Sequence, residues 1–174
     1  KDFTTESRGA GKSWGFGGIR CPFSFAIPFS RLTTDAMNPA YAIGIDLGTH
    51  NCALAQVRLD ADAPSEVLDI AQADGPGTAV DAPILPSFLY RAPEAADWVP
   101  GRWARDMSFL QPDRVVHSAK SWLCHGAVDR QGRLLPWQSA DIPAAERLSP
   151  VEASTRLLRH IREDWERRHG TVFA

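Results

Sequence analysis

Residues 41–59 read YAIGIDLGTHNCALAQVRL, and this stretch decides the fold. An apolar run from Tyr41 to Ile45 ends in Asp46, and a second apolar run extends from Cys52 to Leu59. Between the two runs lies a short turn, residues 47–51, which contains glycine, threonine and asparagine. Two runs rich in β-forming residues on either side of such a turn predict a β-hairpin.

The turn of this hairpin has the chemistry of a phosphate-binding loop. Gly48 lets the backbone approach an anion closely, and successive amide N–H groups there can form an anion-binding nest. Thr49 adds a hydroxyl donor, and Asp46, at the end of the first strand, is a hard oxygen ligand suited to Mg²⁺ or its bound waters. The same residues also fit an ordinary surface hairpin in which Asp46 only starts the turn.

Composition and charge are typical of a soluble globular protein. The 174 residues are 44% hydrophobic and 23% charged, enough for one domain with its own core. A net charge of −2 gives no reason to expect nucleic acid or an anionic membrane as partner, and no apolar run approaches the roughly 18 residues that span a bilayer. Cys21, Cys52 and Cys124 lack the spacing of metal or redox motifs, so we expect reduced, buried thiols in a cytoplasmic protein.

The use of basic residues is uneven. The chain has 16 arginines and three lysines, and Lys120 is the only lysine after Lys12. The planar guanidinium fork of arginine does not replace a compact ammonium group, so an isolated lysine in such a chain is a candidate for chemistry. Chance explains the count equally well.

Residues 1–36 show neither helical nor strand periodicity, and we expect an unstructured extension. Residues 9–13 invite comparison with a phosphate-binding P-loop, but that motif requires a glycine where Glu6 stands, and no apolar strand precedes it. We expect Met37 to be the natural start, with the preceding residues arising from upstream translation. Residues 37–174 then form the folded part.

Further elements follow the hairpin. The pattern predicts a third strand, a loop rich in Gly, Pro and Asp, another strand, a short extended piece and a helix: Glu66–Ala71, Asp74–Pro83, Ile84–Tyr90, Trp98–Gly101 and Arg102–Leu110. Because proline cannot donate to a β-ladder, Pro86 argues for an edge position or a strand start.

A second helix is predicted over Arg114–Cys124, capped by Asp113. Its apolar face would be formed by Val115, Val116, Ala119, Trp122 and Leu123. Lys120 lies beside that face, where it either projects toward a cleft or extends to solvent.

The last helix has the clearest signals. Residues 127–148 look irregular, with strands around Leu134–Trp137. Ser149, Pro150 and Glu152 then form a capping box with proline at the first helical position, and Gly170 ends the helix. A predicted core-facing stripe consists of Val151, Leu157, Leu158, Ile161 and Trp165. Residues 171–174 look like the beginning of a strand.

The motif Gly44-Ile45-Asp46-Leu47-Gly48-Thr49-x-Asn51 resembles the first phosphate motif of the actin-like ATPases, and most closely that of the DnaK-type heat-shock protein 70 chaperones. Further landmarks resemble this family in the same order: Pro86-Ser87 before an apolar strand, Val99-x-Gly101 before a helix with Ala104, Pro112 followed by Ala119-Lys120, and Ser149-Pro150-Val151-Glu152 opening a long helix. The resemblance covers roughly residues 41–170.

The resemblance implies an α/β fold, the first lobe of an actin-like (ribonuclease H-like) nucleotide-binding domain with a mixed sheet and flanking helices. It implies that Asp46 positions Mg²⁺ through water and that Gly48, Thr49, His50 and Asn51 hold the phosphates of ATP or ADP. It further implies that Lys120 and Thr49 belong to the hydrolytic centre. Such positioning and charge neutralisation are what phosphoryl transfer mainly requires.

The chain also departs from the family pattern. His50 stands where a second threonine is usual, which puts the hydrolysis rate in doubt more than binding. Cys124-His125 replaces a basic, glycine-containing turn, which suggests a divergent bacterial branch. The second lobe and the peptide-binding domain would lie beyond Ala174, so we expect an incomplete lobe with an unpaired sheet edge and very weak nucleotide binding. Client peptides and co-chaperones would be partners of the intact protein.

Two other interpretations stay open. A sugar kinase of the actin-like superfamily shares the Asp-x-Gly-Thr turn, although such an enzyme is not expected to place helices at these intervals. A non-catalytic interaction module would also fit, with His50 marking lost activity.

Overall fold

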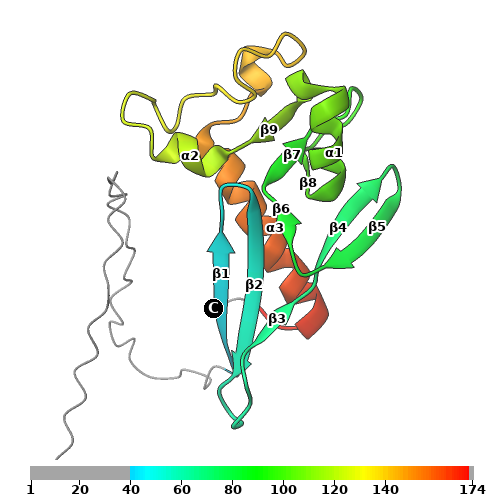
Figure 1. Cartoon of the computed structure of the whole chain (residues 1–174), viewed down its shortest axis with the longest axis vertical. Helices are drawn as coiled ribbons and strands as arrows, with labels where there is room; N and C mark the ends of the chain where they lie inside the picture. Colours follow the sequence, from blue (N-terminus) through cyan, green and yellow to red (C-terminus); the bar gives the residue numbers. More distant parts are fainter. Residues whose placement is uncertain (1–39, 173–174) are drawn as a thin grey trace, which may run out of the picture. The chain divides into compact units, whose positions relative to one another are not determined.

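The computed structural model describes residues 40–172. The predictions for residues 1–36 and for Cys21 therefore lie outside the described residues. The strands are β1 (Tyr41–Leu47), β2 (Asn51–Arg58), β3 (Glu66–Leu68), β4 (Ile70–Gly75), β5 (Thr78–Ala82), β6 (Leu85–Pro86), β7 (Phe88–Tyr90), β8 (Val99–Pro100) and β9 (Val115–His117). The helices are α1 (Arg102–Leu110), α2 (Ala119–Leu123) and α3 (Pro150–His169), with 3-10 turns at Pro112–Arg114 and Ala144–Glu146 (Figure 1).

The predicted hairpin is confirmed. β1 and β2 pair antiparallel from Tyr41 opposite Arg58 to Leu47 opposite Cys52. β2 is the central strand, because it also pairs with β3 and with β6. Within residues 40–172, β1 pairs with β2 alone, so its other edge is open, as the sequence predicted.

The second region of the chain differs from the prediction in two ways. The strand predicted over Glu66–Ala71 is divided at Asp69: β3 continues the β2 sheet, whereas β4 leaves it and pairs with β5. The loop predicted over Asp74–Pro83 is wrong, because most of it forms β5 and the turn of this ribbon. Gly77, with φ 71°, supplies the left-handed residue that the turn requires.

The strand predicted over Ile84–Tyr90 is likewise divided, at Ser87. β6 pairs with β2, whereas β7 forms a separate three-stranded sheet with β8 and β9. Ser87 therefore connects the two sheets. The short extended piece and the helix α1 have the predicted positions.

The helix predicted over Arg114–Cys124 is wrong in its first half. Val115 and Val116 lie in β9, which pairs with β7, because β-branched side chains suit a buried strand and tertiary pairing overrides the helical spacing. Ser118 adopts a left-handed conformation with φ 55°, and α2 begins only at Ala119. The strands predicted around Leu134–Trp137 reduce to one isolated bridge, Leu135 opposite Leu148.

The last helix is confirmed with its caps. Ser149 accepts from the Glu152 amide, Glu152 accepts from the Ser149 amide, and Gly170 ends α3 in a left-handed conformation. The predicted stripe is correct for Leu157, Ile161 and Trp165, which are buried. It is wrong for the other two members: Val151 is 41% exposed and Leu158 is 37% exposed. No strand begins at residues 171–172, and residues 173–174 lie outside the described part.

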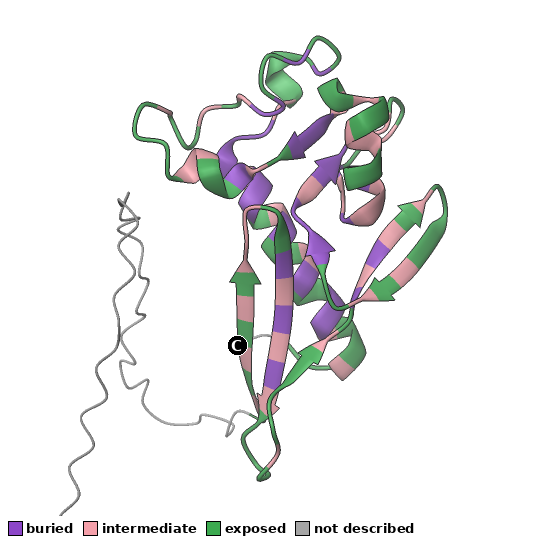
Figure 2. Cartoon of the chain, in the orientation of Figure 1, coloured by how far each residue is buried: buried purple, intermediate pink, exposed green. Residues whose placement is uncertain are grey.

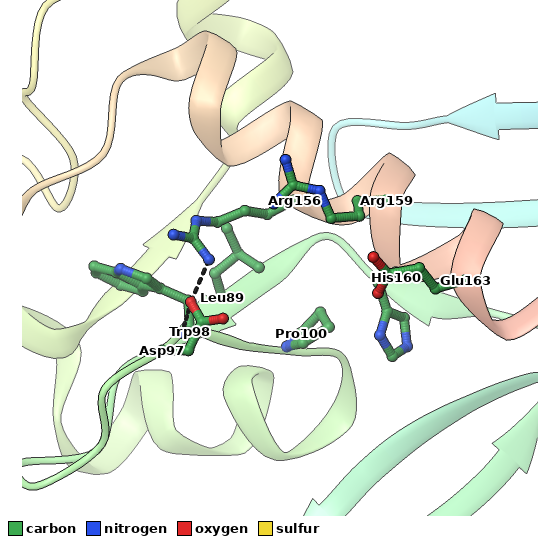
Figure 3. Close-up of a pocket in the computed structure, with 8 residues that line it drawn as sticks. All are labelled: Leu89, Asp97, Trp98, Pro100, Arg156, Arg159, His160 and Glu163. Carbon is green, nitrogen blue, oxygen red and sulfur yellow. Dashed lines mark hydrogen bonds and ion pairs between the residues drawn. The ribbon is translucent and has the colours of Figure 1, made fainter.

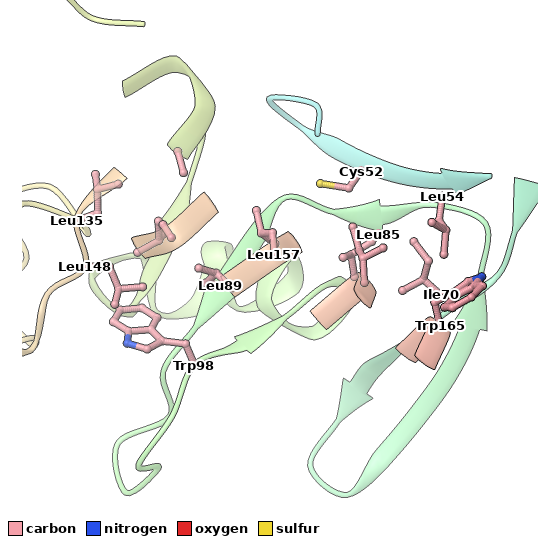
Figure 4. Packing of buried hydrophobic residues seen from close by; sticks show 14 of the residues in the cluster. Cys52, Leu54, Ile70, Leu85, Leu89, Trp98, Leu135, Leu148, Leu157 and Trp165 are labelled. Carbon is pink, nitrogen blue, oxygen red and sulfur yellow. The ribbon is translucent and has the colours of Figure 1, made fainter. Parts of the chain in front are cut away.

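One hydrophobic cluster joins α3 to the strands (Figure 4). Buried positions alternate along β2 and form one side of α3 (Figure 2). The largest side chains of this cluster include Leu54, Ile70, Leu85, Leu89, Ile161 and Trp165. Hence the structure combines helices and strands, as predicted and in a manner compatible with a partial nucleotide-binding lobe.

Two further expectations need correction. Every strand pairing within residues 40–172 is antiparallel, so the expected mixed sheet is wrong for this part of the chain. Cys52 is buried as expected, but Cys124 is exposed. None of the helices in the described part is both long and apolar enough to cross a membrane.

Candidate functional site

The turn between β1 and β2 consists of Gly48, Thr49 and His50, while Asn51 is already the first residue of β2. A Cβ atom on Gly48 would lie 2.1 Å from the carbonyl oxygen of Asn51, so only glycine allows the chain to close here. Gly48 and Thr49 are half-buried, whereas His50 and Asn51 are exposed. The sequence therefore located the turn correctly, and the structure explains its glycine by the close approach of the turn's own backbone.

Ser87 holds this turn from below. Its amide donates to the His50 carbonyl (2.8 Å) and its hydroxyl donates to the Gly48 carbonyl (2.9 Å). Its Oγ also lies 3.2 Å from Cys52 Sγ. Sequence reasoning used Ser87 only as a landmark, because these contacts join residues far apart in the chain.

Cys52 lies directly beneath the turn, and the pKa of its thiol depends on burial and on the groups around it. Burial is the largest influence and raises the pKa of the Cys52 thiol. Hydrogen bonds with Ser87 and with the Gly48 backbone act against this rise in pKa. The Asp46 carboxylate raises the thiol pKa further, and the Lys120 ammonium lowers it.

A carboxylate from the end of β1 and an ammonium from α2 thus both influence the thiol beneath the turn. Because Coulomb interactions weaken with distance, only charges in the neighbourhood of a thiol influence its pKa in this way. Figure 1 also shows α2 beside the β1–β2 turn. Asp46 and Lys120 are exposed, and neither forms an ion pair with any residue in 40–172. Both charges can therefore meet a ligand.

The amide groups of the turn are similarly accessible. Among the described residues, the amides of Thr49 and His50 donate no backbone hydrogen bond, whereas the carbonyls of Gly48 and His50 are both engaged by Ser87. Amide N–H groups without a protein acceptor at a glycine-containing turn suit an anion.

The donor set for a metal ion is small. Within residues 40–172, no group of three or more His, Cys, Asp or Glu side chains is arranged to hold a metal ion. One carboxylate, Asp46, fits Mg²⁺, because this ion keeps several waters and is often bound through one or two carboxylates together with substrate phosphates.

A cavity of about 350 Å³ adjoins the outer side of the turn. Its lining combines an imidazole from the turn with apolar and polar side chains of α1, β7 and β9: His50, Phe88, Ser108, Phe109, Pro112, Val115, His117 and Ser118. Its volume lies in the range of small-molecule pockets. His50 therefore gives the turn an imidazole that lines this cavity.

A second, smaller cavity of about 160 Å³ lies between α3 and β8 (Figure 3). Two of its charged side chains, Arg156 and Asp97, form an ion pair, and His160 Nε2 lies 2.6 Å from the Ala71 carbonyl. Burial raises the pKa of Asp97, but the Trp98 amide and Arg156 outweigh this effect and hold the pKa below its usual value.

Comparison with known proteins supports the resemblance seen in the sequence. No protein-family model matches this chain. A chaperone protein HscA homologue from Azoarcus sp. (strain BH72) is 34% identical over 131 residues. The match covers 70% of this chain and 19% of the relative, so the chain spans about a fifth of that protein's length. This similarity supports a relationship with the heat-shock protein 70 chaperones.

Proposed function

We propose that this chain is the first part of a heat-shock protein 70-like chaperone, in which ATP binding and hydrolysis drive the binding and release of client peptides. The observation that carries this proposal is the turn closed by Gly48, in which the amides of Thr49 and His50 donate no backbone hydrogen bond within residues 40–172. An acidic strand end, an anion-binding turn and an ammonium from a separate helix supply what a triphosphate with its metal requires.

Each group has a separate role in this proposal. The turn Gly48–Asn51 holds the β- and γ-phosphates of ATP, or the β-phosphate of ADP, through amide N–H groups and the Thr49 hydroxyl. Asp46 orients the waters of Mg²⁺, which when bound neutralises phosphate charge. The Lys120 ammonium stabilises the charge on the phosphoryl group being transferred and orients the attacking water.

His50 modifies the site. In place of a hydroxyl it brings an exposed imidazole, which lines the cavity of about 350 Å³ and leaves one fewer donor for the γ-phosphate. We expect slower hydrolysis with little loss of binding. The actin-like fold, the cytoplasmic location and the dependence on co-chaperones belong to the same proposal.

Nucleotide binding should require the rest of the parent protein. The phosphate turn and Lys120 supply one side of a clamp, so residues 37–174 alone are expected to bind ATP very weakly. Isothermal titration of this segment beside the full-length gene product tests the expectation, and micromolar affinity of the segment would overturn it.

The test of the proposed function is ATP turnover by the full-length gene product carrying Lys120→Ala. Because the ammonium would act on developing charge, we expect turnover to fall by about 100-fold or more. Lys120→Arg should not restore the rate, since the guanidinium differs in shape and hydration. The matched control is Arg105→Ala, which removes an exposed cation of α1 whose ion pair within residues 40–172 is with its neighbour Asp106.

Unchanged turnover in Lys120→Ala would contradict the proposed hydrolytic role and favour the non-catalytic interpretation. Turnover that requires an added sugar would favour a kinase instead.

A further inference from the structure

Ser87 occupies an unusual place in the chain, between two short strands that belong to different sheets. Its side chain is buried, with 4% exposed, and it lies directly under the β1–β2 turn. Pro86, just before it, pairs with Asn51, so the backbone on which Ser87 is mounted is itself attached to β2. The position of Ser87 relative to the turn is therefore fixed by strand pairing.

Its contacts with the turn are of two kinds. The Ser87 amide donates to the His50 carbonyl, and the Ser87 hydroxyl donates to the Gly48 carbonyl, at 2.8 Å and 2.9 Å. One residue thus engages two carbonyls of a three-residue turn. Because a serine hydroxyl has a single proton, the Cys52 thiol, 3.2 Å away, is left to donate to Ser87 Oγ.

These contacts determine where the amide groups of the turn point. In a trans peptide unit the carbonyl and the following N–H point in opposite directions. With the Gly48 carbonyl directed at Ser87, the Thr49 N–H points away from Ser87. The His50 carbonyl is likewise directed at Ser87, so the Asn51 N–H points away from Ser87. A rotation of either peptide unit would exchange a donor for an acceptor on the outer side of the turn.

We propose that Ser87 is a positioning residue for nucleotide, which orients the peptide units of the turn so that their N–H groups meet the phosphates. This inference rests on the proposed function, because it assumes that the turn binds phosphate. Ser87 does not touch the nucleotide. It acts through Gly48 and His50.

The test compares two buried serines in the full-length gene product. Ser87→Ala removes the hydroxyl contact with the Gly48 carbonyl, and Ser154→Ala removes an equivalent contact, 2.8 Å from Ser154 Oγ to the Pro150 carbonyl within α3. Both substitutions delete one buried hydroxyl-to-carbonyl bond and should lower Tm; Ser87→Ala should lower it somewhat more, because it also removes the acceptor of the Cys52 thiol. Only Ser87→Ala should raise the Kd for MgATP, by about tenfold, which corresponds to the loss of one hydrogen bond of about 1.4 kcal/mol.

A second measurement does not depend on ATP. Amide hydrogen exchange in the peptide covering residues 85–90, which contains the residue 87 amide that donates to the His50 carbonyl, should without nucleotide be about tenfold faster in Ser87→Ala and unchanged in Ser154→Ala. Ser87→Cys keeps a side chain of similar size, with a thiol that is a weaker donor than the hydroxyl. It should therefore show smaller changes in Kd and in amide exchange than Ser87→Ala. This variant replaces Ser87→Ala in the test if the alanine variant does not fold.

The outcomes separate the two proposals. An unchanged Kd for MgATP in Ser87→Ala, whatever its loss in Tm, would overturn the positioning role of Ser87. Absence of MgATP binding by the unsubstituted protein would refute the proposed function itself. In that case unchanged exchange in Ser87→Ala would still show that Ser87 does not hold the turn.

Discussion

Asp164 on α3 offers the sharpest test of how the helix is attached to the strands. Its side chain is 1% exposed, yet it is a carboxylate. One oxygen accepts from the Ala71 amide of β4 (3.1 Å) and from Arg168 Nε (3.0 Å), and the other pairs with Arg167. Asp164→Ala would leave the Ala71 amide without this acceptor and remove the partner of two cations.

The expected loss of stability can be worked out from these contacts. Removing one partner of a buried charged network typically costs 3–5 kcal/mol. Arg167 is 65% exposed and Arg168 keeps its contact with Asp81, so water and the second carboxylate compensate part of this cost. The main loss is a charge-assisted bond to a backbone amide, and the total should lie near the lower limit, about 3 kcal/mol. For a domain of this size, that lowers Tm by about 10 °C.

Urea denaturation followed by tryptophan fluorescence measures this loss, because Trp165 stacks on His169 at 4.2 Å within the same helix. Asp164→Asn, which keeps an acceptor without charge, should lose about half as much stability. Arg167→Ala is the control and should lose less than about 1 kcal/mol, as exposed ion pairs do. If Asp164→Ala were no more destabilising than Arg167→Ala, the reasoning from burial would be refuted.

Two further predictions concern titratable groups. Burial raises the pKa of the Cys52 thiol, and the thiolate is the form that reacts with iodoacetamide. At pH 8 this reagent should therefore modify the exposed Cys124 of the native protein and spare Cys52, as mapped by mass spectrometry. Equal labelling of the two cysteines would contradict the buried position of Cys52. Because the pKa of Asp97 is lowered in the folded state, its ion pair with Arg156 adds stability above the usual carboxyl pKa of about 3.9, and this is lost as pH falls through the lower folded value. The difference in stability between the unsubstituted protein and Asp97→Asn should therefore disappear in acid, and a difference that persists at pH 2 would contradict this origin.

The elements that could be predicted from the sequence are those with strong local signals. The hairpin of residues 41–59 has two apolar runs and a glycine turn. The helix α3 has a typical N-cap residue, Ser149, and a typical C-cap residue, Gly170. The sequence wrongly predicts a helix over residues 115–117, because apolar valines fit the spacing of a helix as well as that of a strand. Pairing with β7 is what makes this segment a strand. The ribbon β4–β5 was missed although Gly75-Pro76-Gly77 is a turn signal between two short runs.

In the candidate site, too, the residues with a local sequence signal could be predicted, and those that depend on tertiary contacts could not. The turn at Gly48 and Thr49 could be found from its motif, because a tight turn between two strands is a local feature. That Lys120 would influence the same thiol as Asp46 could be expected only from resemblance, since it depends on how α2 packs against the rest of the chain. Ser87 could not be found at all, because its role consists of contacts with carbonyl groups that carry no side-chain signature.

The open edge of β1 has a consequence for how this polypeptide behaves at high concentration. The exposed residues of β1 are Ala42, Gly44 and Asp46. Ala42 and Gly44 are small and uncharged, and no lysine or proline in β1 blocks the approach of another strand. Backbone groups along this side have no strand partner within residues 40–172. The edge strand of a second molecule can therefore pair with β1, so self-association should start at the β1–β2 hairpin.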